Sequence, residues 1–191
     1  QIEPHFLFNT LSNVLSLLDS DPAGGKKMLA DLTRYLRASL SRTRDRTTTL
    51  GQELDLVRAF LDIHKVRMGD RLRYTMDLPP DLREISFPPM LVQPIVENAV
   101  KHGVEPKIGP VHVEVRARRA ADGRLEITVA DDGAGFAAAS SGGGLGLANI
   151  RERLQQIYGD RAALTLQARP DGGVAATLTL PIDEENACPA P

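Results

Sequence analysis

The 191-residue chain is 42% hydrophobic and 25% charged, a composition that excludes wholesale disorder and a collagen-like repeat. Its length suits one compact domain, or one domain plus a helical module. Its net charge of −2 gives no indication of nucleic-acid binding, so we expect no nucleic-acid partner. The single cysteine, Cys188, cannot form an internal disulfide, and no apolar run approaches the roughly 18 to 20 residues of a membrane helix.

The first third of the chain has the periodicity of three helices. Between residues 6 and 18 apolar side chains recur three, four and seven positions apart, and a second apolar stripe runs from 28 to 40. Asp21-Pro22 separates the two helices, because proline is favoured in the first turn of a helix. Thr49 and Gln52 have the spacing of a capping box and predict a third helix, which ends at Gly69-Asp70.

From residue 71 the pattern changes to alternating strands mixed with shorter helical segments. Strands are predicted at 72–78, 111–117, 125–129, 163–169 and 174–180, and helices at about 89–102 and 147–158. Because the helices and the antiparallel strands are segregated, we predict an α+β fold, with an N-terminal helical segment followed by a two-layer α/β sandwich whose mixed sheet is mostly antiparallel. The expected divisions are a helical segment at 1–69, a sandwich domain at 70–182 and a flexible tail at 183–191.

The predicted helix before residue 103 gathers polar side chains on one face. Helical spacing brings Asn98, Lys101 and His102 together. An amide oxygen is a ligand that Mg²⁺ accepts beside phosphate oxygens, and a lysine supplies a point charge for phosphate. The alternative is an amphipathic helix in which Glu97 and Lys101 form an ordinary salt bridge one turn apart.

Two glycine-rich motifs follow. Asp131-Asp132-Gly133-Ala134-Gly135 comes directly after a predicted strand, where a carboxylate can accept a hydrogen bond from an amine and glycines allow a close backbone approach. Gly142-Gly143-Gly144-Leu145-Gly146-Leu147 precedes a helix, as in a lid whose backbone N–H groups face phosphates. Taken singly, the first motif is equally typical of a plain turn and the second of a surface loop.

Together these motifs resemble a known family. Asn98 with Lys101, then Asp131 to Gly135, then Gly144 to Leu147 are similar to the N, G1 and G2 boxes of the Bergerat ATP-binding fold, which gyrase-type ATPases and sensor histidine kinases share. Residues 1–9, with Pro4-His5-Phe6 at their centre, resemble the phosphoacceptor motif of the LytS-type sensor histidine kinases. Residues 91–103 match the N box of that family almost residue for residue, and the resemblance extends over 1–182.

The resemblance implies phosphotransfer from ATP to a histidine, with ATP and Mg²⁺ as cofactors. His5 would be the phosphoacceptor, and Asn98 would hold Mg²⁺. Lys101 and His102 would add charge or hydrogen bonds to the phosphates, and Asp131 would fix the adenine amine. The other nucleotide-binding positions implied by the boxes are Gly133, Gly135, Gly144, Leu145, Gly146 and Leu147.

Two further polar residues are candidates for the chemistry at His5. Glu97 could polarise His5 or order a metal-bound water, and Asn9 lies one helical turn after His5 and could orient a phosphohistidine or a hydrolytic water. A surface salt bridge for Glu97 and an exposed polar position for Asn9 are the alternatives. We expect a packing or surface role for His64 and a solvent-facing position for His112. For Arg67 we expect an ordinary cation at the end of the third helix, the alternative being a contact with the nucleotide or the acceptor helix.

The resemblance also implies partners. They are an aspartate of a response regulator, with a LytTR-type regulator as one form, and a second copy of the chain bound through the N-terminal helices. Because the sequence begins at Gln1 inside a motif, we expect it to be part of a longer protein. The resemblance implies that this chain is the cytoplasmic portion of a bacterial sensor anchored upstream in the inner or plasma membrane. Another Bergerat ATPase, an anti-sigma-type serine kinase and a non-catalytic scaffold are the competing functions.

Overall fold

The computed structural model describes residues 4–42, 48–135, 144–170 and 172–182, and for residues 4, 5, 38–42, 144 and 145 it describes the backbone alone. The α-helices are α1 (Pro4–Ser20), α2 (Pro22–Arg42), α3 (Leu50–Met68), α4 (Gln93–Asn98) and α6 (Gly144–Tyr158). The strands are β1 (Thr48–Thr49), β2 (Leu72–Asp77), β3 (Ser86–Phe87), β4 (Val111–Arg119), β5 (Leu125–Asp131), β6 (Ala163–Ala168) and β7 (Val174–Leu180). The described residues also include four shorter helical segments: η1 (Gly69–Arg71), η2 (Pro80–Leu82), the π-helix η3 (Ala99–Val104) and η4 (Gly159–Arg161).

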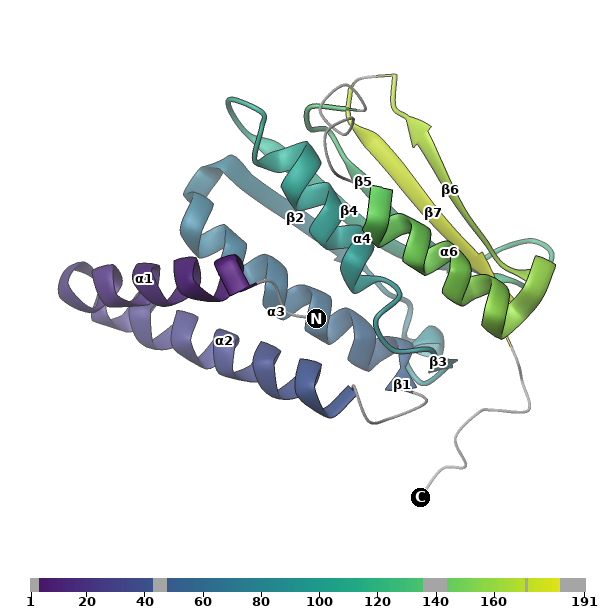
Figure 1. Ribbon diagram of the computed structural model, residues 1–191, viewed down its shortest axis with the longest axis horizontal. Coiled ribbons are helices and arrows are strands. Elements are labelled where there is room, and N and C mark those ends of the chain that lie inside the picture. Colours follow the sequence, from purple (N-terminus) through teal and green to yellow (C-terminus); the bar gives the residue numbers. More distant parts are fainter. Residues whose placement is uncertain (1–3, 43–47, 136–143, 171, 183–191) are drawn as a thin grey trace.

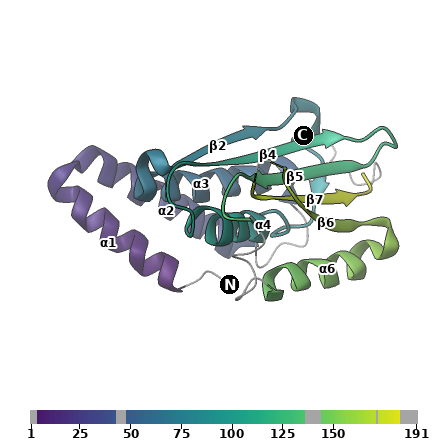
Figure 2. The same cartoon turned by 90° about the horizontal axis from the view of Figure 1, so that it is seen from above.

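The strands form the mixed sheet predicted from the sequence. Its order is β2-β4-β5-β7-β6, in which β2 and β4 run parallel and every other neighbouring pair runs antiparallel. Figure 2 shows α4 and α6 against one face of this sheet, while α1 and α2 form a hairpin beside α3 (Figure 1). The α+β architecture is therefore confirmed.

The start of α3 is fixed by the predicted capping box. The Thr49 hydroxyl accepts a hydrogen bond from the Gln52 N–H at 3.2 Å, and the Thr49 N–H donates to Gln52 Oε1 at 3.4 Å. At the other end of α3, Gly69 has a φ of +58°, a left-handed conformation that glycine adopts without strain. The sequence did not predict the two-residue pairing of β1 with β3, which places Thr49 opposite Ser86.

The helix predicted at 89–102 begins later and ends later than expected. Met90 has a φ of +61°, and α4 begins at Gln93. The buried carboxylate of Glu53 on α3 accepts hydrogen bonds from the N–H groups of Met90 at 3.0 Å, Val92 at 3.1 Å and Gln93 at 3.4 Å. A carboxylate at this position satisfies N–H groups that a helix start leaves unpaired, so α3 determines where α4 begins.

An aromatic cluster joins the three N-terminal helices. The Phe6 ring of α1 lies 5.6 Å from Tyr35 on α2, and 5.4 Å from Phe60 and 5.2 Å from His64 on α3, between ring centroids. His64 is 5% exposed, and burial together with the charge of Arg67 lowers its pKa from 6.5 to about 3. Packing was one of the two roles expected for His64, and it is confirmed.

The hydrophobic core is continuous. Buried apolar side chains from all three N-terminal helices join those of the sheet, α4 and α6 in one cluster. The division expected near residues 69–71 stays a prediction, and the expected tail at 183–191 lies outside the described residues. In the described part of the chain, no helix combines the length and the apolarity that crossing a bilayer requires.

Replacing Thr49 by Ala should lower the free energy of unfolding by about 1 kcal/mol, because the Gln52 N–H loses its side-chain acceptor. Urea denaturation followed by circular dichroism measures the change. Thr33→Ala on α2 is the control, since that hydroxyl bonds only to the Leu29 carbonyl of its own helix, and the change there should stay within about 0.5 kcal/mol. Equal effects of the two substitutions would contradict the role of the capping box.

His64→Gln should alter the pH dependence of stability. The unfolded chain protonates His64 as the pH falls through 6.5 whereas the folded chain resists protonation down to about 3, so acidification destabilises the parent. The stability advantage of the parent over His64→Gln should therefore shrink by about 2 kcal/mol between pH 7 and pH 5. Urea titrations of both proteins at the two pH values test this, and a difference that does not change with pH would contradict the buried, neutral His64.

Candidate functional site

A cavity of about 400 Å³ lies where the helical segment meets α4. Side chains from α1, α2 and α3 form one side of it, and α4, η3 and the start of α6 form the other. Its lining residues are Phe6, Tyr35, Phe60, His64, Arg67, Pro94, Glu97, Asn98, Val100, Lys101, His102, Glu105 and Gly146. The cavity therefore joins segments that are far apart in the sequence.

The polar residues predicted to share a helix face all line this cavity. Asn98 is the last residue of α4, and Lys101 and His102 lie in η3. A π-helix takes one residue more per turn than an α-helix, and such segments are frequent at functional sites. An amide, an ammonium group and an imidazole thus border one space, which suits an anionic ligand such as a polyphosphate.

Glu97 is held by two neighbouring side chains. Its Oε1 accepts a hydrogen bond from Gln93 Nε2 at 3.0 Å and from the Tyr35 hydroxyl at 3.4 Å. Burial, and then the Glu97 carboxylate, raise the pKa of Tyr35 well above its usual value, so this hydroxyl keeps its proton and stays a donor. The glutamate carboxylate consequently has a fixed position at the cavity wall.

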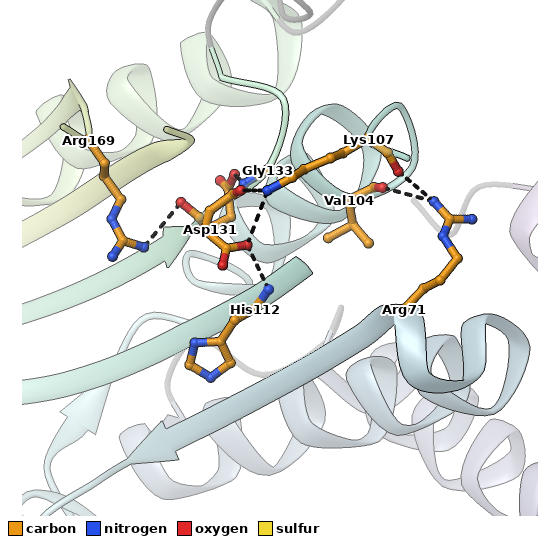
Figure 3. A network of polar contacts seen from close by, with 8 residues as sticks. Arg71, Val104, Lys107, His112, Asp131, Gly133 and Arg169 are labelled. Carbon is orange, nitrogen blue, oxygen red and sulfur yellow. Dashed lines mark hydrogen bonds and ion pairs between the residues drawn. The ribbon is translucent and has the colours of Figure 1, made fainter. Parts of the chain in front are cut away.

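Asp131 ends β5 and is 3% exposed. Its Oδ1 accepts a hydrogen bond from the Gly133 N–H at 2.9 Å, and its carbonyl accepts one from Arg169 Nη1 at 3.2 Å (Figure 3). Burial raises the pKa of this carboxyl, and the N–H groups of Gly133 and Val174 oppose that shift. Asp131 is not among the residues that line the 400 Å³ cavity, but its carboxylate packs against Gly103, five residues after Asn98.

Glycines pack directly against Asp131. A Cβ on Gly103 would lie 2.5 Å from Asp131 Oδ1, and a Cβ on Gly133 would overlap the Gly103 carbonyl. The Ala134 N–H also donates to the Gly103 carbonyl at 3.1 Å. The end of the predicted N box and the start of the predicted G1 box are therefore in direct backbone contact, which only residues without side chains permit.

A polar network that the sequence did not predict holds the segment after η3 in place. Lys107 Nζ donates to the Asp132 carbonyl, and the Asp132 carboxylate accepts from the His112 N–H at 2.8 Å (Figure 3). Arg71 Nη2 donates to the Lys107 carbonyl at 2.8 Å. The His112 ring contacts Thr75 on β2, and its position is half-buried.

The glycine-rich positions are only partly described. Gly135 has a φ of +73°, and Gly146 on α6 lines the cavity with Asn98. Leu147 is buried, whereas only the backbone of Gly144 and Leu145 is described. Gly142 and Gly143, the first two residues of the predicted lid motif, lie outside the described residues.

His5 lies in the first turn of α1, where the structure describes its backbone alone. The residue that follows it, Phe6, lines the cavity. Asn9 lies one turn further along α1, is half-buried and is not among the lining residues.

The sequence predicted only a general structural role, or no role, for three residues that line the cavity: His64, Arg67 and Glu105. Arg67 donates to Glu105 Oε1 at 2.5 Å and to His64 Nδ1 at 3.1 Å. A guanidinium only donates, so Nδ1 must accept, and the proton of the neutral His64 ring lies on Nε2. The expectation of an ordinary helix-end cation for Arg67 is therefore incomplete, because it links α3 to the segment after η3. Arg67 and Glu105 lie 38 residues apart, so no local sequence pattern could predict their contact.

The donor set fits Mg²⁺ only in combination with a nucleotide. Among the described residues, no group of three or more His, Cys, Asp and Glu side chains could hold a metal ion by itself. Mg²⁺ at nucleotide sites takes one or two protein ligands together with phosphate oxygens and waters. The amide of Asn98 at the cavity wall matches that requirement.

Two family models match the chain. The first, described as histidine kinase, matches residues 1–72, and the second, described as histidine kinase-, DNA gyrase B- and HSP90-like ATPase, matches residues 87–184. Together they extend over most of the sequence, on either side of a short gap.

Individual relatives agree with these models. The sensor histidine kinase YesM of Bacillus subtilis is 32% identical over 97% of the chain, and the sensor protein LytS of Staphylococcus haemolyticus is 30% identical over 90%. The chain spans about one third of the length of these curated relatives.

A solved structure shares the fold. The histidine kinase domain of the blue-light activated histidine kinase EL346 from Erythrobacter litoralis aligns over 96% of this chain and 90% of its own, with a TM-score of 0.55 and 20% identity. Matches to both family models, and relatives that align over nearly the whole sequence, lead to one conclusion: the chain belongs to the histidine kinase family.

Proposed function

We propose that this chain is the catalytic core of a two-component sensor histidine kinase. It transfers the γ-phosphoryl group of ATP to His5, and the phosphoryl group then passes to an aspartate of a response regulator. One observation carries the proposal: Phe6, the neighbour of His5, lines the same cavity as Asn98, Lys101 and His102. Phosphoryl transfer requires mainly alignment and charge neutralisation, and the two sides of this cavity supply an acceptor and cationic groups.

His5 is the nucleophile of the proposed reaction. The reference pKa of histidine, about 6.5, leaves most imidazoles neutral at pH 7 and above. A ring nitrogen forms the N–P bond while the bond between the γ-phosphorus and the bridging oxygen breaks, and ADP leaves. The imidazole loses its N–H proton, for which Glu97 is the candidate acceptor, since Gln93 and Tyr35 hold its carboxylate at the cavity wall.

The cationic wall of the cavity binds the triphosphate. Lys101 and His102 contact phosphate oxygens, and Asn98 holds Mg²⁺ through its amide oxygen. When bound, Mg²⁺ would neutralise charge on the phosphates. Asn9, one helical turn after His5, is the candidate to orient the phosphohistidine or a hydrolytic water.

Asp131 accepts the adenine amine in this proposal. Its buried position and its glycine surroundings support recognition of a flat ring at close range. Gly133 and Gly135 allow the backbone to approach the base, and Gly144, Leu145, Gly146 and Leu147 form the segment that contacts the phosphates. In the present structure the Asp131 carboxylate accepts a hydrogen bond from the Gly133 N–H, so the adenine amine would be a further donor to this carboxylate.

We further propose that the kinase works as a homodimer through α1. Phe8 is 68% exposed and Leu15 is 67% exposed, and with Leu11 and Leu18 they are spaced along one face of the helix. An apolar stripe of this kind is typical of a helix that packs against a partner. The resemblance to LytS sensors supports a LytTR-type regulator as the partner. It also supports an anchor of the longer protein in the bacterial inner or plasma membrane, with this chain in the cytoplasm.

The labelling experiment for the proposed function compares the parent with His5→Gln in [γ-³²P]ATP and Mg²⁺. The parent should acquire label that survives alkali and is lost in acid, as expected for a phosphohistidine, and His5→Gln should acquire none. Label that is stable to acid in the parent would favour a serine kinase of the anti-sigma type, and equal labelling of the two proteins would remove His5 from the mechanism.

Asn98→Asp, measured in parallel, separates nucleotide chemistry from folding. A carboxylate in place of the amide adds negative charge beside the phosphates, so labelling should fall below detection while the circular dichroism spectrum and the unfolding transition stay near those of the parent. Undiminished labelling would exclude Asn98 from the site.

Leu15→Glu should dissociate the dimer, because a charge would lie in the middle of the apolar stripe on α1. Light scattering coupled to size-exclusion chromatography should show a dimer for the parent and a monomer for Leu15→Glu. Leu29→Glu, an exposed position on α2 outside the stripe, should remain dimeric. A monomeric parent would contradict dimerisation of this chain through α1.

A further inference from the structure

We infer that Tyr35, Phe60 and His64 form a docking pocket for Phe6, and that Phe6 is the positioning residue that holds the phosphoacceptor turn of α1 at the cavity. This inference rests on the proposed function, because it concerns how His5 reaches the transferred phosphoryl group. Tyr35, Phe60 and His64 together form what we call the aromatic pocket.

His5 lies in the turn of α1 directly before Phe6. Under the proposed function, a small displacement of this turn changes the distance over which the phosphoryl group must be transferred. A contact that holds this turn in place therefore affects phosphotransfer.

Phe6 supplies a firm contact in that turn. It is 8% exposed, nearly parallel to the His64 ring at 20° and edge-on to Tyr35 at 68°. Its carbonyl accepts a hydrogen bond from the buried Thr10 hydroxyl at 2.7 Å. Both the side chain and the backbone of the residue after His5 are thus fixed.

The aromatic pocket is also attached to the nucleotide side of the cavity. Tyr35 donates to Glu97, and His64 accepts from Arg67, which in turn binds Glu105. Phe6 therefore docks onto side chains whose other contacts reach α4 and the segment after η3. The Phe6 ring in this pocket therefore positions the first described turn of α1 relative to Asn98, and not only relative to α2.

A general packing role would predict a different result from a positioning role. Val14 is the matched control, since it is buried in the same helix at 4% exposure but does not line the cavity. Phe6→Ala and Val14→Ala both remove apolar packing from α1. Only the first substitution removes the contact between α1 and the aromatic pocket.

The test measures initial rates of His5 phosphorylation against ATP concentration. Phe6→Ala should lower the maximal rate by about 10- to 100-fold, the effect of misplacing a reacting group by about an ångström, and change the KM for ATP by less than about twofold. Val14→Ala should stay within about threefold of the parent in both. A maximal rate for Phe6→Ala that equals or exceeds that of the parent would overturn the inference. A higher rate would indicate that docking of Phe6 restrains His5.

Hydrogen exchange provides a readout that does not depend on activity. The amides of residues 8–10 should exchange faster in Phe6→Ala than in the parent or in Val14→Ala, and unchanged exchange would also overturn the inference. A parent that acquires no phosphohistidine would contradict the proposed function instead. Labelling of the parent with an unaltered rate in Phe6→Ala would contradict the docking role alone.

Discussion

The buried carboxylate of Glu53 is the constraint on which the cavity depends. It is fully buried and accepts hydrogen bonds from three backbone N–H groups at the start of α4. A charged acceptor inside the protein is stable only where such donors surround it, and the start of α4 needs an acceptor in turn. The position of Asn98, one and a half turns further along, therefore follows from the position of α3.

Helix α3 fixes the other side of the cavity as well. Phe60 and His64 contact Phe6 of α1, and Arg67 binds Glu105 beyond η3. One helix thus carries contacts to both of the surfaces between which a phosphoryl group would pass. In this arrangement a displacement of α1 relative to α3 would change the distance between His5 and the polar wall.

Local sequence patterns predicted the elements whose signals are local. The Asp21-Pro22 break, the Thr49 capping box, the alternating strands and the shared cavity position of Asn98, Lys101 and His102 all depend on residues a few positions apart. The late start of α4, the β1–β3 pairing and the aromatic pocket depend on side chains more than 25 residues apart, which no periodicity reveals. The close packing of Gly133 on the Gly103 backbone was also not predictable, because the two glycines lie 30 residues apart.

The central claim is that His5 and the nucleotide phosphates meet in one cavity, and the four histidines of the chain allow a direct measurement. The parent, with ¹³C-labelled histidine, is titrated with Mn²⁺ and a non-hydrolysable ATP analogue, and paramagnetic broadening of the ring signals is recorded by NMR. The account predicts strong broadening of His5, His64 and His102, and sharp signals from His112, whose ring contacts Thr75 on β2. A sharp His5 signal beside a broadened His102 signal would contradict it.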